Sequence, residues 1–279
     1  MTHIIYKIYK LETNPSTNEL DDLIIGGKIK FLREILLNNC QFKRDVNNDW
    51  ILKFFVGKNY EQSFLISKNL FRRELCLSTS SLIIGKDDFN NNDAEILSSS
   101  VRENKSLKIT DFTEYPSHYS HIDGKGISFF SKLDGQREQF ERHIILQSLA
   151  YAYLGAIEFI ANKLAEKINC HDCNINELNE LYIEAAKFNS MFFFHQPVLS
   201  KNTSLTETWK CIDKALDVNV SSNELLGQLS NVHYILNLEA EKEKAELDNR
   251  YQAKQDKLNT RFTIIGIIIG LLSLIELFK

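Results

Sequence analysis

The sequence predicts an α+β N-terminal domain followed by a helical bundle, a long stalk helix and one C-terminal transmembrane helix. Turn residues predict the first part, because seven of the 11 glycines and two of the three prolines lie within residues 1–135. Apolar residues then recur at three- and four-residue steps, which is typical of helices. A final run without charge predicts the membrane helix. We therefore expect an α+β domain at 1–135, a bundle at 136–220, a stalk or coiled coil at 221–261 and an anchor at 262–278.

Composition narrows the class of protein. The chain has 279 residues, of which 43% are hydrophobic and 25% charged, and these shares are ordinary for a folded domain. A net charge of -4 argues against a nucleic-acid partner, since such proteins carry a basic excess. The first ten residues alternate apolar and polar side chains, which predicts a β-strand and not a secretory signal. Five cysteines, an odd number, favour reduced thiols in the cytoplasm.

The first half should hold short strands and one helix. A glycine turn at 57–59 should join two of the strands, and an apolar face predicts a helix from about Lys28 to Asn38. Polar runs at 90–93 and 98–100 predict exposed loops. The expected strands are Ile4–Leu11, Trp50–Val56, Ser63–Ser67, Leu75–Ile84, Leu107–Phe112 and Ile127–Leu133.

Helices should follow from Gln136 onward. Apolar residues between Phe140 and Leu164 are dense enough for a helix buried on several sides. Its segment 144–161 raises the alternative of a membrane crossing, which internal polar residues such as Gln147 and Glu158 disfavour. Pro197 should close the second of these helices. Three further helix starts are predicted from capping pairs, which are Asn174 with Glu177, Ser204 with Glu207 and Ser221 with Glu224.

The last helix has the features of a tail anchor. No charge occurs between Phe262 and Ile275, and the run to Phe278 is about 25 Å long, at the short end of what spans a bilayer. The preceding cations predict a single-pass protein with a cytoplasmic N-terminus by the positive-inside rule. The alternative is a buried C-terminal helix of a soluble protein. The cations are Arg250, Lys254, Lys257 and Arg261.

Small residues on this helix predict self-association in the lipid bilayer. Thr263, Gly266, Gly270 and Ser273 lie within about 80° of arc, and such a stripe lets helices approach closely. The stripe could also line or seal a pore, although glycine is common in membrane helices. Upstream, 239–261 contains six acidic and six basic residues and no glycine or proline. We expect one helix from about Ser222 to Phe278, with a solvated stalk or loose coiled coil in its middle.

The stretch Lys257-Leu-Asn-Thr-Arg-Phe-Thr-Ile-Ile-Gly-Ile-Ile-Ile-Gly continues a long charged helix into an apolar one. In this arrangement the C-terminal 60 or so residues resemble the CorA-like membrane proteins. The ending Ile-Gly-Leu-Leu-Ser-Leu-Ile-Glu-Leu-Phe is also similar to the anchored tail of the "required for meiotic nuclear division" family. The Gly-Met-Asn signature of the CorA family and its second membrane helix are absent here. The resemblance therefore implies membrane assembly and does not carry over ion-selecting residues.

Three clusters are candidates for binding. Gly26-Gly27-Lys28 leads into the expected helix, and a glycine turn at a helix start can hold an anion. Arg72, Arg73, Arg137 and Arg142 could join such a site. Cys170-His171-Asp172-Cys173 resembles half a zinc site, which His195 and Cys211 would have to complete; a loop with reduced thiols is the alternative. His118, His121 and Asp123 should lie in an exposed loop that could bind a metal.

We find no catalytic motif, and so expect no enzyme, no catalytic residue, no cofactor and no assigned metal. The leading hypothesis is a tail-anchored, self-associating membrane protein with a cytoplasmic sensing head. It could act as a CorA-like pore-forming or membrane-perturbing effector in a bacterial stress response or in antiviral defence. Its partners would be the lipid bilayer, further copies of itself, and a cytoplasmic protein or small-molecule signal. Two alternatives stay open: a membrane-tethered scaffold for a cytoplasmic complex, and an enzyme active in the α+β head.

Overall fold

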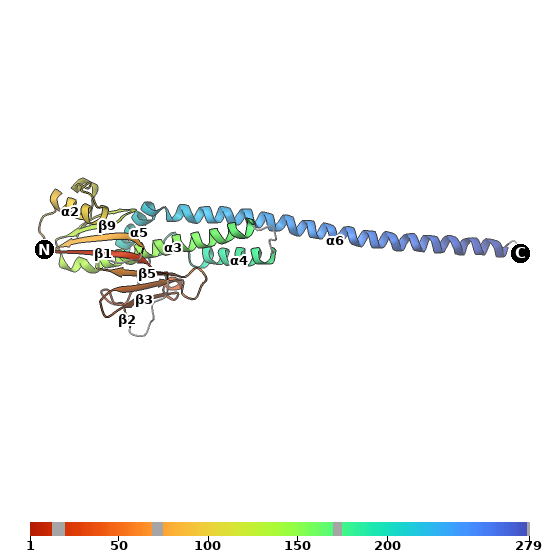
Figure 1. Ribbon diagram of the computed structural model, residues 1–279, viewed down its shortest axis with the longest axis horizontal. Coiled ribbons are helices and arrows are strands. Elements are labelled where there is room, and N and C mark those ends of the chain that lie inside the picture. Colours follow the sequence, from red (N-terminus) through yellow and green to blue (C-terminus); the bar gives the residue numbers. More distant parts are fainter. Residues whose placement is uncertain (13–19, 69–74, 170–174, 278–279) are drawn as a thin grey trace. The chain divides into compact units, whose positions relative to one another are not determined.

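The computed structural model describes residues 1–12, 20–68, 75–169 and 175–277 (Figure 1). The chain divides into two compact units, Met1–Gly227 and Gln228–Lys279. A mixed sheet comes first in the sequence and a long helical region follows, as the sequence predicts. The finer division into four segments stays a prediction.

The described strands form one nine-stranded sheet in the order β2-β3-β4-β5-β1-β6-β9-β8-β7. Neighbouring strands are antiparallel except β6 and β9, which run parallel. Five of the expected strands are confirmed, as is the turn at Gly57, whose φ is 75°. The strands are β1 (Thr2–Lys10), β2 (Asp21–Asp22), β3 (Cys40–Arg44), β4 (Trp50–Phe54), β5 (Gln62–Ser67), β6 (Cys76–Ile84), β7 (Thr113–Glu114), β8 (Tyr119–Asp123) and β9 (Gly126–Ser131).

Helices cover both faces of the sheet (Figure 1). The helix α2 (Asn91–Arg102) packs its Leu97 against Ile83 and Phe130, which point to one face. The long helix α3 (Arg137–Asn169) lies on the other face, where the rings of Phe129 and Phe140 are 5.5 Å apart. Because side chains alternate along a strand, adjacent residues of β9 serve both cores. The helices α4 (Ile175–Met191) and α5 (Thr203–Leu216) pack against α3.

Polar residues of α3 form hydrogen bonds to the sheet and within the helix. The Glu141 carboxylate accepts from the Tyr6 hydroxyl at 2.8 Å and from Arg137 Nε at 3.0 Å. Ser80 Oγ donates to Gln147 Oε1 at 3.1 Å, and Ser148 Oγ donates to the Ile144 carbonyl at 2.9 Å. These bonds are the reason that polar side chains are tolerated inside a buried helix.

The predicted loops at 90–93 and 98–100 are wrong, because residues 91–93 and 98–100 belong to α2 and Asn90 is its N-cap. Asn90 caps this helix by accepting from the Asp93 amide at 3.1 Å, while the Asp93 carboxylate accepts from the Asn90 amide. The Asn/Asp cluster was therefore a helix start and not a turn. Within the helix, Ser98 is buried, and its Oγ donates to the Asn104 carbonyl at 2.7 Å.

The strand predicted at Leu107–Phe112 is also wrong. Its centre is a 3-10 turn, Ile109–Asp111, and the backbone bonds to side chains instead of to a neighbouring strand. Ser98 Oγ accepts from the Leu107 amide at 3.2 Å, and the Asp111 carboxylate accepts from the Lys108 amide at 2.8 Å. The apolar residues that suggested a strand instead fill the core beneath α2.

The helix predicted over Lys28–Asn38 is reduced to one turn, α1 (Glu34–Leu37). The preceding residues are extended, because Leu32 forms a bridge with Val198. The Leu199 amide donates to the Phe31 carbonyl at 2.8 Å, and the Arg33 amide donates to the Pro197 carbonyl at 2.9 Å. Pairing with a segment far away in sequence therefore overrides the local helical pattern.

Two of the three predicted helix starts are displaced. The helix α5 begins at Thr203 with Asn202 as its N-cap residue, ahead of the expected Ser204. The last helix, α6, runs from Val218 to Leu277 and begins before the expected Ser221. The α4 pair includes Asn174, which lies outside the described residues. The second helix also ends at Met191, before Pro197.

Candidate functional site

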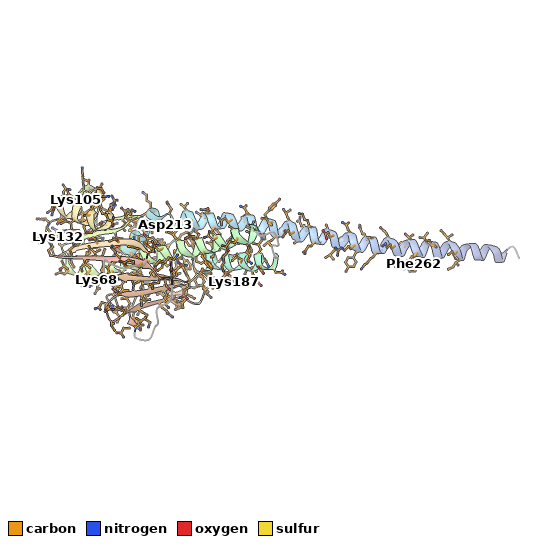
Figure 2. All side chains as sticks on the ribbon, in the orientation of Figure 1. Lys68, Lys105, Lys132, Lys187, Asp213 and Phe262 are labelled. Carbon is orange, nitrogen blue, oxygen red and sulfur yellow. The ribbon has the colours of Figure 1, made fainter. Side chains whose placement is uncertain are left out.

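The apolar end of α6 is exposed. Phe262 is 68% exposed and Ile267 58%, and the other isoleucines up to residue 269 are more than half exposed as well (Figure 2). A side chain added at Gly266 or Gly270 would meet no atom within 4 Å in the described part of the chain. Thr263 Oγ1 donates to the Asn259 carbonyl at 2.8 Å. Ser273 lies on the same helix, although its side chain and Phe278 fall outside the description.

One helix in the described part of the chain, Asp134–Ile168, is long and apolar enough to cross a membrane by length and composition. This stretch consists of the 3-10 turn Asp134–Gln136 and α3 without its last residue. However, 67% of its apolar stretch is buried inside the protein, which is the pattern of a core helix. This candidate lies in the middle of the chain and is separate from the anchor predicted at 262–278.

The glycine turn lies beside α3. Gly26 and Gly27 have φ values of 58° and 112°, which favour glycine. A Cβ on Gly26 would also collide with the carboxylate of Glu138 and the guanidinium of Arg142. The turn therefore lies directly against two side chains of α3, and its positive φ values are what favour glycine there.

A pocket of about 260 Å³ opens beside this turn. Lys28 of the predicted site lines this pocket, and Arg142 lines it from α3. The sequence did not point to the other two cations in its wall, Lys30 and Lys201. The remaining lining residues are Ile25, Ile29, Phe31, Asn202 and Leu205.

The bridge between Leu32 and Val198 explains how these cations meet. It aligns residues 31–33 with 197–199, which places Lys30 and Lys201 at neighbouring ends of the paired segments. The alternation Lys28-Ile29-Lys30-Phe31 was a signal for this extended conformation, since apolar and charged residues change places at every step. Of the other expected arginines, Arg137 pairs with Glu141, while Arg72 and Arg73 lie outside the described residues.

His118 and His121 do not form a joint metal site, and their expected loop is the strand β8 with the residue before it. His118 is buried between Tyr115 and Phe129, with ring centroids 4.6 and 4.4 Å away, and burial lowers its pKa to about 4. His121 contacts Arg102 Nη2 at 2.8 Å through its Nε2. Side chains alternate between the two faces of a strand, and residues 118 and 121 are three positions apart. Their side chains therefore point to opposite faces.

His121 belongs to a separate cluster at the end of α2, where Arg102 and Asp123 form an ion pair. Arg102 Nε donates to Asp123 Oδ2 at 2.6 Å. Burial would raise the pKa of the Asp123 carboxyl, but hydrogen bonds from His121, the Lys125 amide and Arg102 hold it below its usual value. The hydrogen bond with Asp123 in turn raises the pKa of His121, against the effect of burial. These groups satisfy one another, which indicates a structural role.

The cysteine cluster at 170–173 lies outside the described residues. Its two expected partners have other neighbours, because His195 Nδ1 bonds to Asn219 Oδ1 and Cys211 interacts with Tyr115. In the part of the chain that the structure covers, no three His, Cys, Asp or Glu side chains are placed to hold a metal ion.

The comparisons with known proteins add no family to this description. The chain matches no protein-family model, no curated protein and no solved structure.

Proposed function

We propose that this protein is a tail-anchored, self-associating membrane protein whose cytoplasmic head responds to a ligand or partner. One observation carries the proposal: bulky apolar side chains project from α6 on most sides and are exposed, as Phe262 and Ile267 illustrate. A helix in a soluble protein normally shows one apolar face and one polar face. An apolar surface around most of a helix is stable in lipid.

The arrangement around the helix supports self-association. At about 100° per residue, the bulky residues from Phe262 to Ile269 cover about 220° of arc. The remaining sector contains Thr263, Gly266, Gly270 and Ser273, and the described space beside both glycines is open. In a bilayer this sector would let a second copy approach closely, and the bulky sector would face lipid.

The charged part of α6 supports a stalk between head and membrane. Every residue from Glu241 to Arg261 is exposed. Leu247, Tyr251 and Leu258 are more than half exposed and are spaced by four and seven residues. Such a seam suits a loose coiled coil between copies. The cations before Phe262 favour a cytoplasmic head under the positive-inside rule.

Alkaline carbonate extraction of membranes from expressing cells tests the anchor. The full chain should stay in the membrane pellet, whereas a chain ending at Arg261 should move to the supernatant. A chain whose residues 262–278 are replaced by an unrelated membrane helix is the matched control. Release of the full chain by carbonate would contradict the proposal.

Dye leakage from vesicles tests the stronger version, in which the assembled protein perturbs the membrane as a stress or antiviral effector. Leakage that is lost in Gly266→Leu/Gly270→Leu would support this role. If the anchor-swapped chain retains full function in cells and vesicles never leak, the protein is a tethered scaffold.

A further inference from the structure

We propose that the pocket beside Gly26 binds the phosphate group of a small molecule or of a lipid headgroup. Four cations line the pocket, namely Lys28, Lys30, Arg142 and Lys201, and its lining includes no carboxylate from the described residues. Like charges gathered in one concave site repel each other and create a strong positive potential. A multiply charged anion would relieve this repulsion. The inference supplies a ligand for the proposed head and does not depend on the membrane anchor.

The charges in the pocket are largely uncompensated. Among the described residues, no ion pair within 4.0 Å joins Lys28, Lys30 or Lys201 to a carboxylate. Arg142 has only a long contact, 3.7 Å, with the half-exposed Glu138. At the edge, Lys28 contributes to lowering the pKa of the Asp22 carboxyl, after the larger effect of Lys43. The pocket therefore keeps a positive excess.

A second pocket of the protein has a different charge pattern, with both cations and carboxylates in its lining. The groove between the β4–β5 turn and α4 has about 370 Å³, but it combines Lys58 and Lys187 with Glu180 and Glu184. Its charges balance, so it offers no preference for anions. The contrast indicates that the cationic lining beside Gly26 does not follow from the general composition of the surface.

The site is also held in place before any ligand arrives. Its cations come from the glycine turn, from α3 and from the segment before α5, and backbone bonds at 2.8 and 2.9 Å fix the paired segments 31–33 and 197–199. A preorganised site loses less conformational entropy on binding. Asn202 is the N-cap of the 14-residue helix α5, and its side chain makes no capping bond within the described part of the chain. The helix end in the pocket therefore adds to the attraction for an anion.

The size of the pocket limits the ligand. At about 260 Å³ it lies just below the usual range for small-molecule sites, so it would enclose a phosphate or pyrophosphate with part of an attached group. Apolar side chains from Ile25, Ile29 and Leu205 form part of the wall and could contact that group. A nucleotide and a phosphorylated lipid headgroup share this chemistry.

Calorimetric titration of the full chain in detergent with pyrophosphate, at constant ionic strength, tests the inference. We expect saturable binding that Lys30→Gln/Lys201→Gln weakens by roughly a hundredfold, about tenfold for each charge-assisted contact. Lys105→Gln/Lys125→Gln removes two exposed lysines that do not line the pocket, of which Figure 2 labels Lys105. This variant should bind pyrophosphate as the unaltered protein does. Glu138→Gln should strengthen binding, because it removes the carboxylate near Arg142.

Two further arms separate the sources of the phosphate. ATP should compete with pyrophosphate if the ligand is a free nucleotide. If the ligand is a lipid headgroup, nanodiscs with a phosphoinositide should weaken pyrophosphate binding relative to nanodiscs with phosphatidylcholine alone. Absence of saturable pyrophosphate binding, or equal binding by the Lys30/Lys201 variant, would overturn the inference. Both lysine pairs should unfold at the same temperature, and carbonate extraction of the Lys30/Lys201 variant reports on the anchor separately.

Discussion

Two long apolar helical segments of this protein have opposite surroundings. In α3, Ile144, Ile145 and Leu149 are fully buried, whereas in α6 Phe262 and Ile267 are 68% and 58% exposed. Polar residues also distinguish them, since Glu141 and Gln147 of α3 have hydrogen-bond partners on the sheet and no charge occurs between Phe262 and Ile275. A helix that carries polar groups needs protein partners, while a helix without them is suited to lipid.

The largest contrast is expected when one lysine is placed in the apolar segment of α3 and another in that of α6, because the first should lower stability and the second membrane binding. Leu149→Lys buries a charge among apolar side chains and should cost about 4 kcal/mol or more of the free energy of unfolding. Ile268→Lys should leave the fold intact, yet lower the membrane partition constant by about a hundredfold, since a lysine inside a bilayer costs about 3 kcal/mol. Trp50 and Trp209 are both buried in the first unit, so fluorescence during urea unfolding measures its stability.

Leu149→Met and Ile268→Leu are the controls, because they keep the volume and the apolar character. If Leu149→Lys folds normally, or if Ile268→Lys remains fully membrane-bound, the contrast between the two segments is wrong.

The next largest contrast is expected between Glu141, a buried carboxylate of α3, and Glu246, an exposed carboxylate of α6. Glu141→Ala leaves the Tyr6 hydroxyl and Arg137 without their acceptor and should destabilise the protein by about 3 kcal/mol. Glu246→Ala removes an exposed contact of 3.8 Å with Arg250 and should change stability by less than about 0.5 kcal/mol. Urea unfolding compares them, and equal effects would show that burial does not separate these pairs. Glu141→Gln should recover part of the loss, because its amide oxygen still accepts.

Acid should lower the stability of the first unit, where His118 and His143 are buried, and should leave the apolar end of α6 unaffected. Burial lowers the pKa of His118 to about 4 and that of His143 to about 3, with the neighbouring His118 a smaller cause for His143. The unfolded chain therefore binds more protons below pH 6.5, so stability is full above that pH and falls towards pH 4. One such histidine accounts for about 2 kcal/mol between pH 7.5 and pH 5.

Unfolding measured near pH 7.5 and pH 5 should show this loss, reduced in part by His121, whose raised pKa acts in the opposite direction. His143→Gln should flatten the dependence. Membrane association measured by sedimentation at the two pH values should stay equal, since residues 262–275 contain no titratable group. A flat profile for the unaltered protein would contradict the neutral burial of both histidines.

Two helical glycines should give the smallest contrast. A Cβ at Gly155 of α3 would collide with the side-chain amide of Gln62, so Gly155→Val should cost about 1–2 kcal/mol. Gly266→Val has open space and should leave unfolding unchanged, but it should weaken self-association in detergent by about tenfold. Analytical ultracentrifugation measures the second effect. If Gly266→Val self-associates as the unaltered protein does, the small-residue stripe is not the surface through which copies associate.

Features that depend on neighbours in sequence were predicted well. The alternation at β1, the apolar run at β4 and the periodicity of α3 each predicted the observed element. Predictions were wrong where a polar side chain replaced the expected backbone partner. Asn90 marked the start of a helix, and Ser98 with Asp111 satisfied the backbone of an expected strand.

The candidate pocket could be found only in part. Lys28 followed from the glycine turn, and Arg142 was named as a residue that could join it. Lys201 is about 170 residues away in sequence, and no local rule connects it to the turn. The bridge between Leu32 and Val198 makes that connection, and the same pairing reduces the expected helix to α1.

By itself, the sequence determined that a mixed sheet precedes a long helical region and that the last helix is apolar on most sides, because both properties follow from the spacing of apolar residues. The tertiary structure decided which apolar helix is covered. It buried α3 against the sheet and left the described residues after Phe262 exposed. It also gathered four cations from three segments into one pocket, since that arrangement depends on pairing between residues distant in the chain.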